Sequence, residues 1–211
     1  LLVVYMDGSV SCNHGGTEMG QGLNTKMAQV CADGLGIGVD KVRITATDSQ
    51  KVPNASATSA SSGADINGAA IMNATAQMRD RLKPVAARML GCAAEEVSFA
   101  NSQLHGGGKS VDWADVTKQA WLDRVGLSVT GFYMTPEIKY DFTTLNGRAF
   151  YYYCYGAAVS EVEIDTRTGE WWLQAVDIVH DVGRSINPAL DKGQIEGAYI
   201  QGMGWLTMEE C

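Results

Sequence analysis

Basic residues are scarce in this chain, which narrows the classes of protein to which it can belong. Its 211 residues include 16 lysines and arginines against 24 aspartates and glutamates, for a formal net charge of −8. Proteins that bind nucleic acids need clustered lysine and arginine for phosphate contacts, so we predict no nucleic-acid partner. No apolar run approaches the roughly 18 residues of a membrane span, and no signal peptide is recognisable. We therefore expect no membrane association.

Cysteine and histidine are too few and too scattered to suggest a metal centre or a disulfide framework. The five cysteines are odd in number and include no CxxC pair, which is typical of a reduced, cytoplasmic chain. His14, His105 and His180 lie far apart without metal-ligand spacing, so each is interpreted as structural. We predict a cytoplasmic protein that does not ligate a metal with its own side chains.

The apolar pattern predicts an α+β fold with mainly antiparallel sheets and packed helices. Residues 1–14 are typical of a hairpin that turns at Asp7-Gly8. A helical stripe follows the first glycine-rich loop and stops at Gly36. A longer helix is expected from about Ser62 to Leu90, and Pro84 within it predicts a kink or a break.

The chain divides into three parts in this interpretation. Residues 1–90 and 132–211 hold the larger elements, and residues 91–131 form a smaller α+β insert that includes a strand at "LSVTGF". The last part contains a long hairpin with "DTRTGE" at its turn. A glycine-rich helix then begins at Asn187-Pro188, which suit the cap and the first helical position, and runs to Glu210.

The stretch "GGTEMGQG", residues 15–22, joins a strand to a helix. Backbone N–H groups at such a junction are expected to point outward, unpaired, beside the positive end of the helix dipole. Glycine lets an anion or a flat heterocycle approach the backbone, and Gln21 adds both donors and an acceptor. Composition alone leaves a plain turn equally open.

Two further segments have similar chemistry. "TSASSGAD", residues 58–65, places four hydroxyls at the start of the long helix, where they can cap it or bind a phosphate. In "GQIEGAYIQGMG", residues 193–204, four glycines weaken a helix, while Gln194 and Gln201 share one narrow polar face. Ordinary capping and close packing of another helix are the alternatives for these two segments.

Together these segments resemble the xanthine dehydrogenase and aldehyde oxidase family of molybdenum hydroxylases. The resemblance extends over nearly the whole chain and is closest to the molybdenum-binding large subunit of the bacterial enzymes. It rests on "GGTEMGQGLNTKMAQV", "VPNASATSASSGADINGAA", "GFYMTPEIKY", "YGAAVSEVEIDTRTGE" and "HDVGRSINPALDKGQIEGAYIQGMGWLTMEE". It implies a molybdopterin-binding domain.

The resemblance also implies which residues contact the cofactor. The family's GQG turn contacts the pterin, which gives that role to Gly20 and Gln21. The segment before the long helix lies against the molybdenum and the pterin phosphate, and the glutamine of "GQIEG" is another contact. These roles fall on Thr58, Ala60, Ser61, Ser62 and Gln194.

The reaction implied is hydroxylation of an electron-poor ring carbon, as in the oxidation of hypoxanthine and xanthine to urate. The electrons leave through 2Fe-2S clusters and FAD to NAD in the complete enzyme, and this chain binds none of those groups. The implied partners are the remainder of the molybdenum subunit, an iron–sulfur and FAD subunit or domain, a purine substrate and a second copy of the complete enzyme.

We assign no catalytic residue to this chain. The family's base is a glutamate in a Gly-Glu-Pro-Pro-like segment, which this sequence does not contain; Glu18, Glu161, Glu163 and Glu196 do not match it. We therefore expect a fragment of a catalytic subunit that does not turn over substrate alone. Two alternatives stay open: an aldehyde oxidase or other azaheterocycle hydroxylase, and a module that binds the pterin without catalysis.

Overall fold

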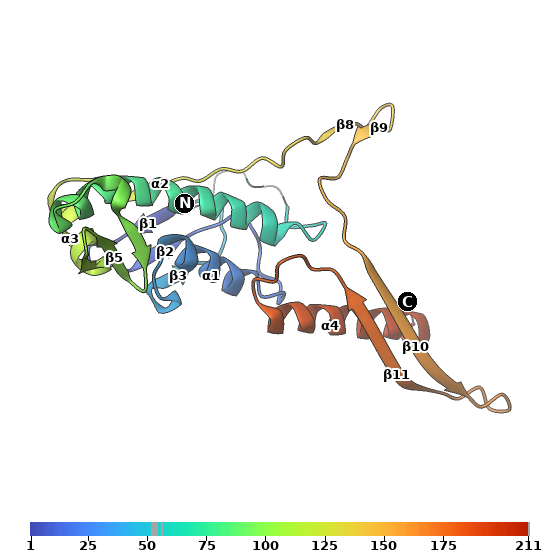
Figure 1. Cartoon of the computed structure of the whole chain (residues 1–211). Coiled ribbons are helices and arrows are strands. Elements are labelled where there is room, and N and C mark those ends of the chain that lie inside the picture. Colours follow the sequence, from blue (N-terminus) through green and yellow to red (C-terminus); the bar gives the residue numbers. More distant parts are fainter. Residues whose placement is uncertain (52–54, 56, 211) are drawn as a thin grey trace. The chain divides into compact units, whose positions relative to one another are not determined.

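The computed structural model describes residues 1–51, 55 and 57–210 (Figure 1). The chain groups into two compact units, Leu1–Met134 and Thr135–Cys211. Small, mainly antiparallel sheets combine with packed helices, so the predicted α+β fold is confirmed. The finer division into residues 1–90, 91–131 and 132–211 stays a prediction.

The first unit is built on a four-stranded sheet with the order β3-β2-β1-β7. Its strands are β1 (Leu2–Val4), β2 (Val10–Cys12), β3 (Val42–Ile44) and β7 (Ser128–Val129). The first two form the predicted antiparallel hairpin, whereas β3 runs parallel to β2. The strand expected at "LSVTGF" is short and pairs with β1, so the predicted insert contributes to this sheet. Alternation along β1 and β2 buries every second side chain in the core.

Two helices pack side by side in this unit, α1 (Leu23–Leu35) and α2 (Gly63–Leu90) (Figure 1). The first ends at Gly36 as predicted, with φ +70°. The second runs unbroken through Pro84, so of the two predicted alternatives the break is wrong and the kink stays a prediction. Proline removes one N–H donor there, but Val85 and Ala86 are buried directly after it. Packing of this last turn against the core therefore keeps the backbone helical.

A three-stranded antiparallel sheet and α3 (Trp113–Leu122) complete the unit. The sheet consists of β4 (Ser98–Ala100), β5 (Gln103–Gly106) and β6 (Lys109–Asp112), and two single-turn 3₁₀ helices flank the region at Val39–Lys41 and Ala94–Glu96. Trp113 is fully buried, and its indole Nε1 donates to the carbonyl oxygen of Gly8 at 2.8 Å. Residues 91–131 thus share one core with the first hairpin.

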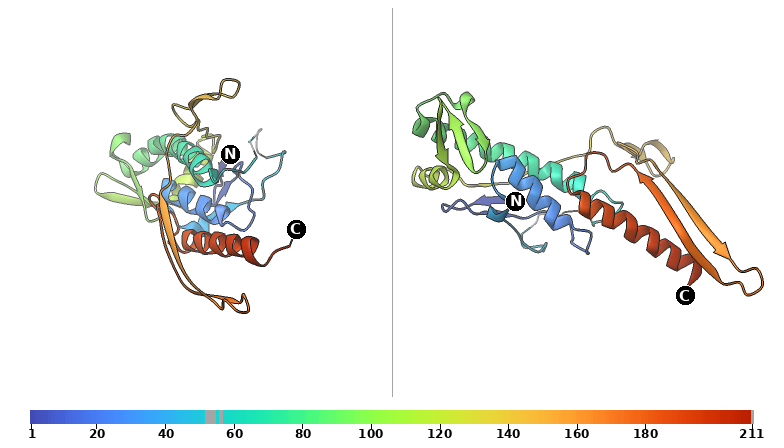
Figure 2. Two further views of the ribbon diagram at one scale, coloured as in Figure 1. Left: turned by 90° about the vertical axis from the view of Figure 1, so that its right-hand side faces the viewer. Right: turned by 60° about the horizontal axis from the view of Figure 1, so that its bottom comes forward.

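The second unit consists of two hairpins and α4 (Pro188–Thr207) (Figure 2). The short hairpin pairs β8 (Lys139–Asp141) with β9 (Asn146–Arg148), and the long one pairs β10 (Gly156–Ile164) with β11 (Trp171–His180). Asn187 caps α4 as predicted, accepting from the N–H of Leu190 at 3.2 Å, but the helix ends at Thr207 rather than Glu210. Among the described residues of this unit, only Gly204 is buried. None of the described helices has the length and apolar character to cross a bilayer.

Candidate functional site

The first loop, residues 15–22, folds around the carboxylate of Glu18. Its Oε1 accepts hydrogen bonds from the N–H groups of Gly20 and Gly22 at 2.9 and 3.0 Å, and its Oε2 accepts one from Asn24 at 2.8 Å. Burial alone would raise the pKa of Glu18, but the three backbone donors outweigh it and lower that pKa. The expectation that this loop leaves its amides unpaired is therefore wrong for Gly20 and Gly22. The carboxylate of Glu18 accepts hydrogen bonds from both of these N–H groups.

Gln21 folds back onto the same loop. Its Oε1 accepts from the N–H of Met19 at 2.6 Å, and its Nε2 donates to the carbonyl oxygen of Thr17 at 2.8 Å. An amide side chain has two donor hydrogens and two acceptor lone pairs. Gln21 therefore keeps one of each for a ligand while its orientation is already set.

His14 anchors the start of the loop. The N–H of Gly16 can only donate, so His14 Nδ1 accepts it at 3.1 Å, and Nε2 carries the proton that it donates to Asn24 Oδ1 at 2.9 Å. Burial lowers the pKa of His14, and the opposing effects of Asn24 and Glu18 do not reverse this. The neutral ring is thus built into the loop, in agreement with the structural role predicted for it.

The second loop ends in two residues with left-handed backbone, Ala60 and Ser61, at φ +58° and +54°. Ser62 follows as the N-cap of α2, and its hydroxyl donates to the carbonyl oxygen of Ser59 at 3.2 Å instead of capping the helix. Within the described part of the chain, the N–H groups of Gly63 and Ala64 meet no acceptor. This helix start keeps donors for an anion, whereas at α1 the N–H groups of Gly22 and Asn24 already bond to the Glu18 carboxylate.

Two side-chain contacts join the loops. The Thr58 hydroxyl oxygen accepts from the N–H of Thr17 at 2.8 Å. Asn67 of α2 accepts from the N–H of Gly15 at 3.1 Å and donates to the carbonyl oxygen of Gly63 at 2.8 Å. Thr58, from the segment predicted to bind phosphate, therefore lies directly against the loop that carries Gly20 and Gln21.

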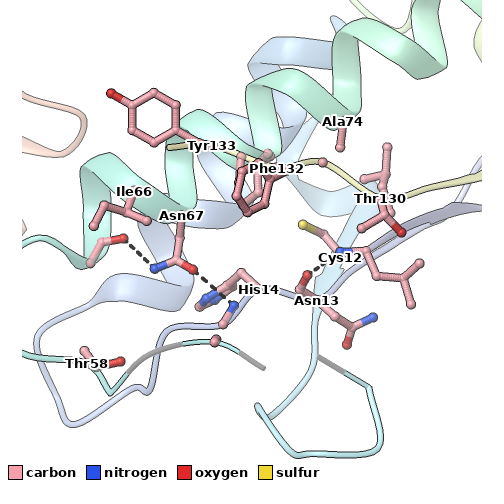
Figure 3. Close-up of a pocket in the computed structure, with 18 of the residues that line it drawn as sticks. Cys12, Asn13, His14, Thr58, Ile66, Asn67, Ala74, Thr130, Phe132 and Tyr133 are labelled. Atoms are coloured by element: carbon pink, nitrogen blue, oxygen red, sulfur yellow. Dashed lines mark hydrogen bonds between the residues drawn. The ribbon is translucent and has the colours of Figure 1, made fainter. Parts of the chain in front are cut away.

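A cavity of about 400 Å³ lies beside this junction (Figure 3). His14 and Asn67 form part of its polar wall, while Ile66 and Phe132 are apolar. Of the residues predicted to contact a cofactor, the cavity is lined by Thr58 and Ser62, and not by Gly20, Gln21, Ala60 or Ser61.

The third candidate segment belongs to the second unit, where Gln194 is exposed on α4. A Cβ atom built on Gly193, Gly197 or Gly202 would meet no described atom within 4 Å. Within the second unit, these glycines therefore do not pack closely against another described element. The convergence of Gln194 with the first two loops stays a prediction.

Three residues that organise the site were not singled out for this from the sequence: Glu18, His14 and Asn67. Glu18 had a usable signal, because a carboxylate just ahead of a helix that lacks its own side-chain cap complements the helix dipole. Asn67 had no such signal in the sequence, because the N–H group from which its side chain accepts a hydrogen bond lies 52 residues away.

Two of the other glutamates considered from the sequence make contacts within the second unit. Glu163 Oε2 accepts from Gln174 Nε2 at 2.9 Å, and Glu196 pairs with Lys192 at 3.5 Å along α4. Among the residues that the structure describes, no three or more His, Cys, Asp or Glu side chains are grouped so that they could hold a metal ion.

Sequence comparisons show which known proteins this chain resembles. The model of the molybdopterin cofactor-binding domain family matches residues 1–211. Over 210 residues the chain is 45% identical to the xanthine dehydrogenase of Oryza sativa subsp. japonica and 48% identical to the xanthine dehydrogenase/oxidase of Gallus gallus. Each match covers 100% of this chain but only 14% of the relative, so the chain spans a small part of these proteins.

Solved structures agree on the fold. Quinoline 2-oxidoreductase from Pseudomonas putida 86 matches with a TM-score of 0.79 at 27% identity, over 93% of this chain and 25% of that one. Reconstituted CO dehydrogenase from Oligotropha carboxidovorans has the same TM-score at 24% identity, over 93% of this chain and 24% of that one. At that identity the second match shows the fold alone.

Proposed function

Because this chain belongs to the molybdopterin cofactor-binding domain family, we propose that it forms part of the molybdenum-binding catalytic subunit of a xanthine dehydrogenase-like oxidoreductase. The complete enzyme oxidises hypoxanthine and xanthine to urate and passes the electrons to NAD. Identity of 45% over 210 residues to a xanthine dehydrogenase supports this assignment. It favours a purine hydroxylase over an aldehyde oxidase or a non-catalytic module.

The start of α2 is the part of this chain that best fits the phosphate of molybdopterin, and this observation carries the proposal. The N–H groups of Gly63 and Ala64 meet no acceptor among the described residues. The hydroxyls of Thr58 and Ser61 can add donors beside them. The Ser62 hydroxyl lies at the same helix start but already donates to Ser59. An anion at this position also interacts favourably with the helix dipole.

The pterin ring requires a different set of contacts, because its edge is neutral and carries both donors and acceptors. Gln21 keeps one donor and one acceptor, and Gln194 offers the same groups from α4. Gly20 and Ala60 leave room for the ring to approach the backbone. When bound, the cofactor supplies the two-electron oxidation, and the residues named here bind and orient it.

The partners of this chain follow from the same assignment. We propose the remainder of the molybdenum subunit, an iron–sulfur and FAD subunit or domain, a purine substrate and homodimers of the complete enzyme, in the cytoplasm. Large apolar side chains of the second unit, among them Tyr153 and Trp205, are 66% and 68% exposed, which supports a covering partner. None of the residues of this chain is assigned as the catalytic base, so we expect the 211 residues alone not to turn over substrate.

Ser61→Ala and Gln21→Ala in the holoenzyme test the proposal. We expect both to lower the molybdenum and pterin content per protein, with purine oxidation falling in proportion to the cofactor retained. Ser110→Ala, an exposed residue of β6, is the control. Molybdenum is measured by elemental analysis and the pterin by the fluorescence of its oxidised form. Full cofactor content in both variants would contradict the assignment of these residues.

A further inference from the structure

The N–H groups of the first loop are directed mostly at side chains of the chain itself. Six of them have a side-chain acceptor, namely those of Gly15, Gly16, Thr17, Met19, Gly20 and Gly22. The N–H groups of Glu18 and Gln21 meet no acceptor in the described part of the chain. The loop therefore holds its shape without a ligand.

Glu18 replaces a cap that α1 does not have. The N-cap residue of this helix is Gly22, which has no side chain, and no acidic residue lies in the first turn. The Glu18 carboxylate reaches three N–H groups at that end, from Gly20, Gly22 and Asn24. Hydrogen bonds to a charged acceptor are stronger than those between neutral groups, so this carboxylate is the main constraint on the loop.

The two helix starts consequently differ in the ligand they can accept. At α1 the negative charge of Glu18 already occupies the anion position, so a phosphate there would be repelled and would find the N–H groups of Gly22 and Asn24 taken. At α2 the N–H groups of Gly63 and Ala64 meet no acceptor among the described residues, a carboxylate included. The first loop can still offer the neutral amide of Gln21, whose orientation depends on the loop that Glu18 holds.

We infer that Glu18 is a positioning and specificity residue for the cofactor, an inference that rests on the proposed function. Its carboxylate excludes the phosphate from α1, so that the phosphate lies at α2. The same carboxylate fixes the loop that presents Gln21 to the neutral edge of the pterin. Glu18 does not itself touch the reacting atoms.

Hydrogen exchange in the holoenzyme tests whether the Glu18 carboxylate holds the first loop in place. Glu18→Gln keeps the size of the side chain but removes one acceptor, and Glu18→Ala removes both. We expect the amides of Gly20, Gly22 and Asn24 to exchange about tenfold faster in Glu18→Ala, since a charge-assisted bond is lost at each. Added formate should slow the exchange again by filling the carboxylate position. Unchanged exchange in Glu18→Ala, or no rescue by formate, would overturn the inference.

Cofactor retention tests whether Glu18 contributes to positioning the cofactor. Molybdenum loss during dialysis should be about tenfold faster in Glu18→Gln than in wild type, with Glu95→Gln, an exposed glutamate of the 3₁₀ helix Ala94–Glu96, at the wild-type rate. Faster exchange with molybdenum loss no faster than in Glu95→Gln would refute a role in cofactor positioning. Full retention in Gln21→Ala and Ser61→Ala would instead refute the proposed function, while the exchange result for Glu18 would stand.

Discussion

The N–H of Thr17 donates a hydrogen bond to the side-chain oxygen of Thr58 at 2.8 Å, across 41 residues of sequence. This bond joins the loop that carries Gln21 to the loop that precedes α2. The proposed site requires both loops at once, because one would hold the pterin edge and the other the phosphate. Their contact before any ligand is bound reduces the entropy that binding would otherwise cost.

Thr58→Val should remove one of the two contacts between the loops with little change in the shape of the side chain. Valine fills the same space but cannot accept from Thr17, which costs about 0.5–1.5 kcal/mol of stability. Thr58→Ser keeps the hydroxyl and is the matched control. Urea unfolding gives the stability, and exchange at the Thr17 amide reports the bond directly. Equal exchange rates in the valine and serine variants would show that the bond does not form in solution.

The neutral state of His14 predicts a pH dependence. Its pKa in the fold is lowered from the ordinary 6.5, so the unfolded chain binds a proton more readily than the folded one. The contribution of neutral His14 to the free energy of unfolding is complete above pH 6.5. It is lost as the pH falls from 6.5 to the lowered pKa of the folded state. Protonation would also set Nδ1–H against the N–H of Gly16. Melting temperatures over this range should fall more in wild type than in His14→Gln, and an equal fall in the two proteins would contradict this role of His14.

Trp113 connects α3 to the first hairpin and should be sensitive to substitution. Trp113→Phe leaves the Gly8 carbonyl without its donor, at a cost of about 1–3 kcal/mol, and Trp113→Ala should cost about 3–5 kcal/mol through the cavity it leaves. Trp121, also in α3 but 55% exposed, provides the control Trp121→Phe. Denaturant midpoints measure these losses of stability. Similar losses of stability for Trp113→Phe and Trp121→Phe would contradict the packing of Trp113 against the first hairpin.

Gly197→Ala separates helix stability from cofactor binding. A Cβ at Gly197 meets open space, and alanine favours a helix by about 1 kcal/mol over glycine, so stability should rise or stay constant. If Gly197 keeps the Gln194 face narrow for the pterin, molybdenum content in the holoenzyme should fall nevertheless. Gly202→Ala is the control, because this glycine is equally open but, five residues along the helix, is turned away from Gly197; it should raise helix stability without lowering molybdenum content. Equal molybdenum content in the two variants would argue against the narrow face.

Elements whose signals lie within a few residues could be predicted from the sequence. The hairpin at Asp7-Gly8, the end of α1 at Gly36 and the cap at Asn187 all depend on local backbone chemistry. The continuity of α2 through Pro84 could not be predicted, because it depends on burial of the following turn. Nor could the pairing of the short β7 with β1, which joins segments more than a hundred residues apart.

The amino-acid sequence by itself determined the family, the class of cofactor and most of the helices and strands, because long motifs and local propensities carry that information. Only the tertiary structure decided how the site is divided. It directed the N–H groups of Gly20, Gly22 and Asn24 to Glu18 and brought Thr58 against Thr17. It also left the N–H groups of Gly63 and Ala64 without an acceptor among the residues that the structure describes. The physical reason is that hydrogen-bond satisfaction depends on which groups meet in space, and residues far apart in sequence supply Thr58 and Asn67 to the first loop.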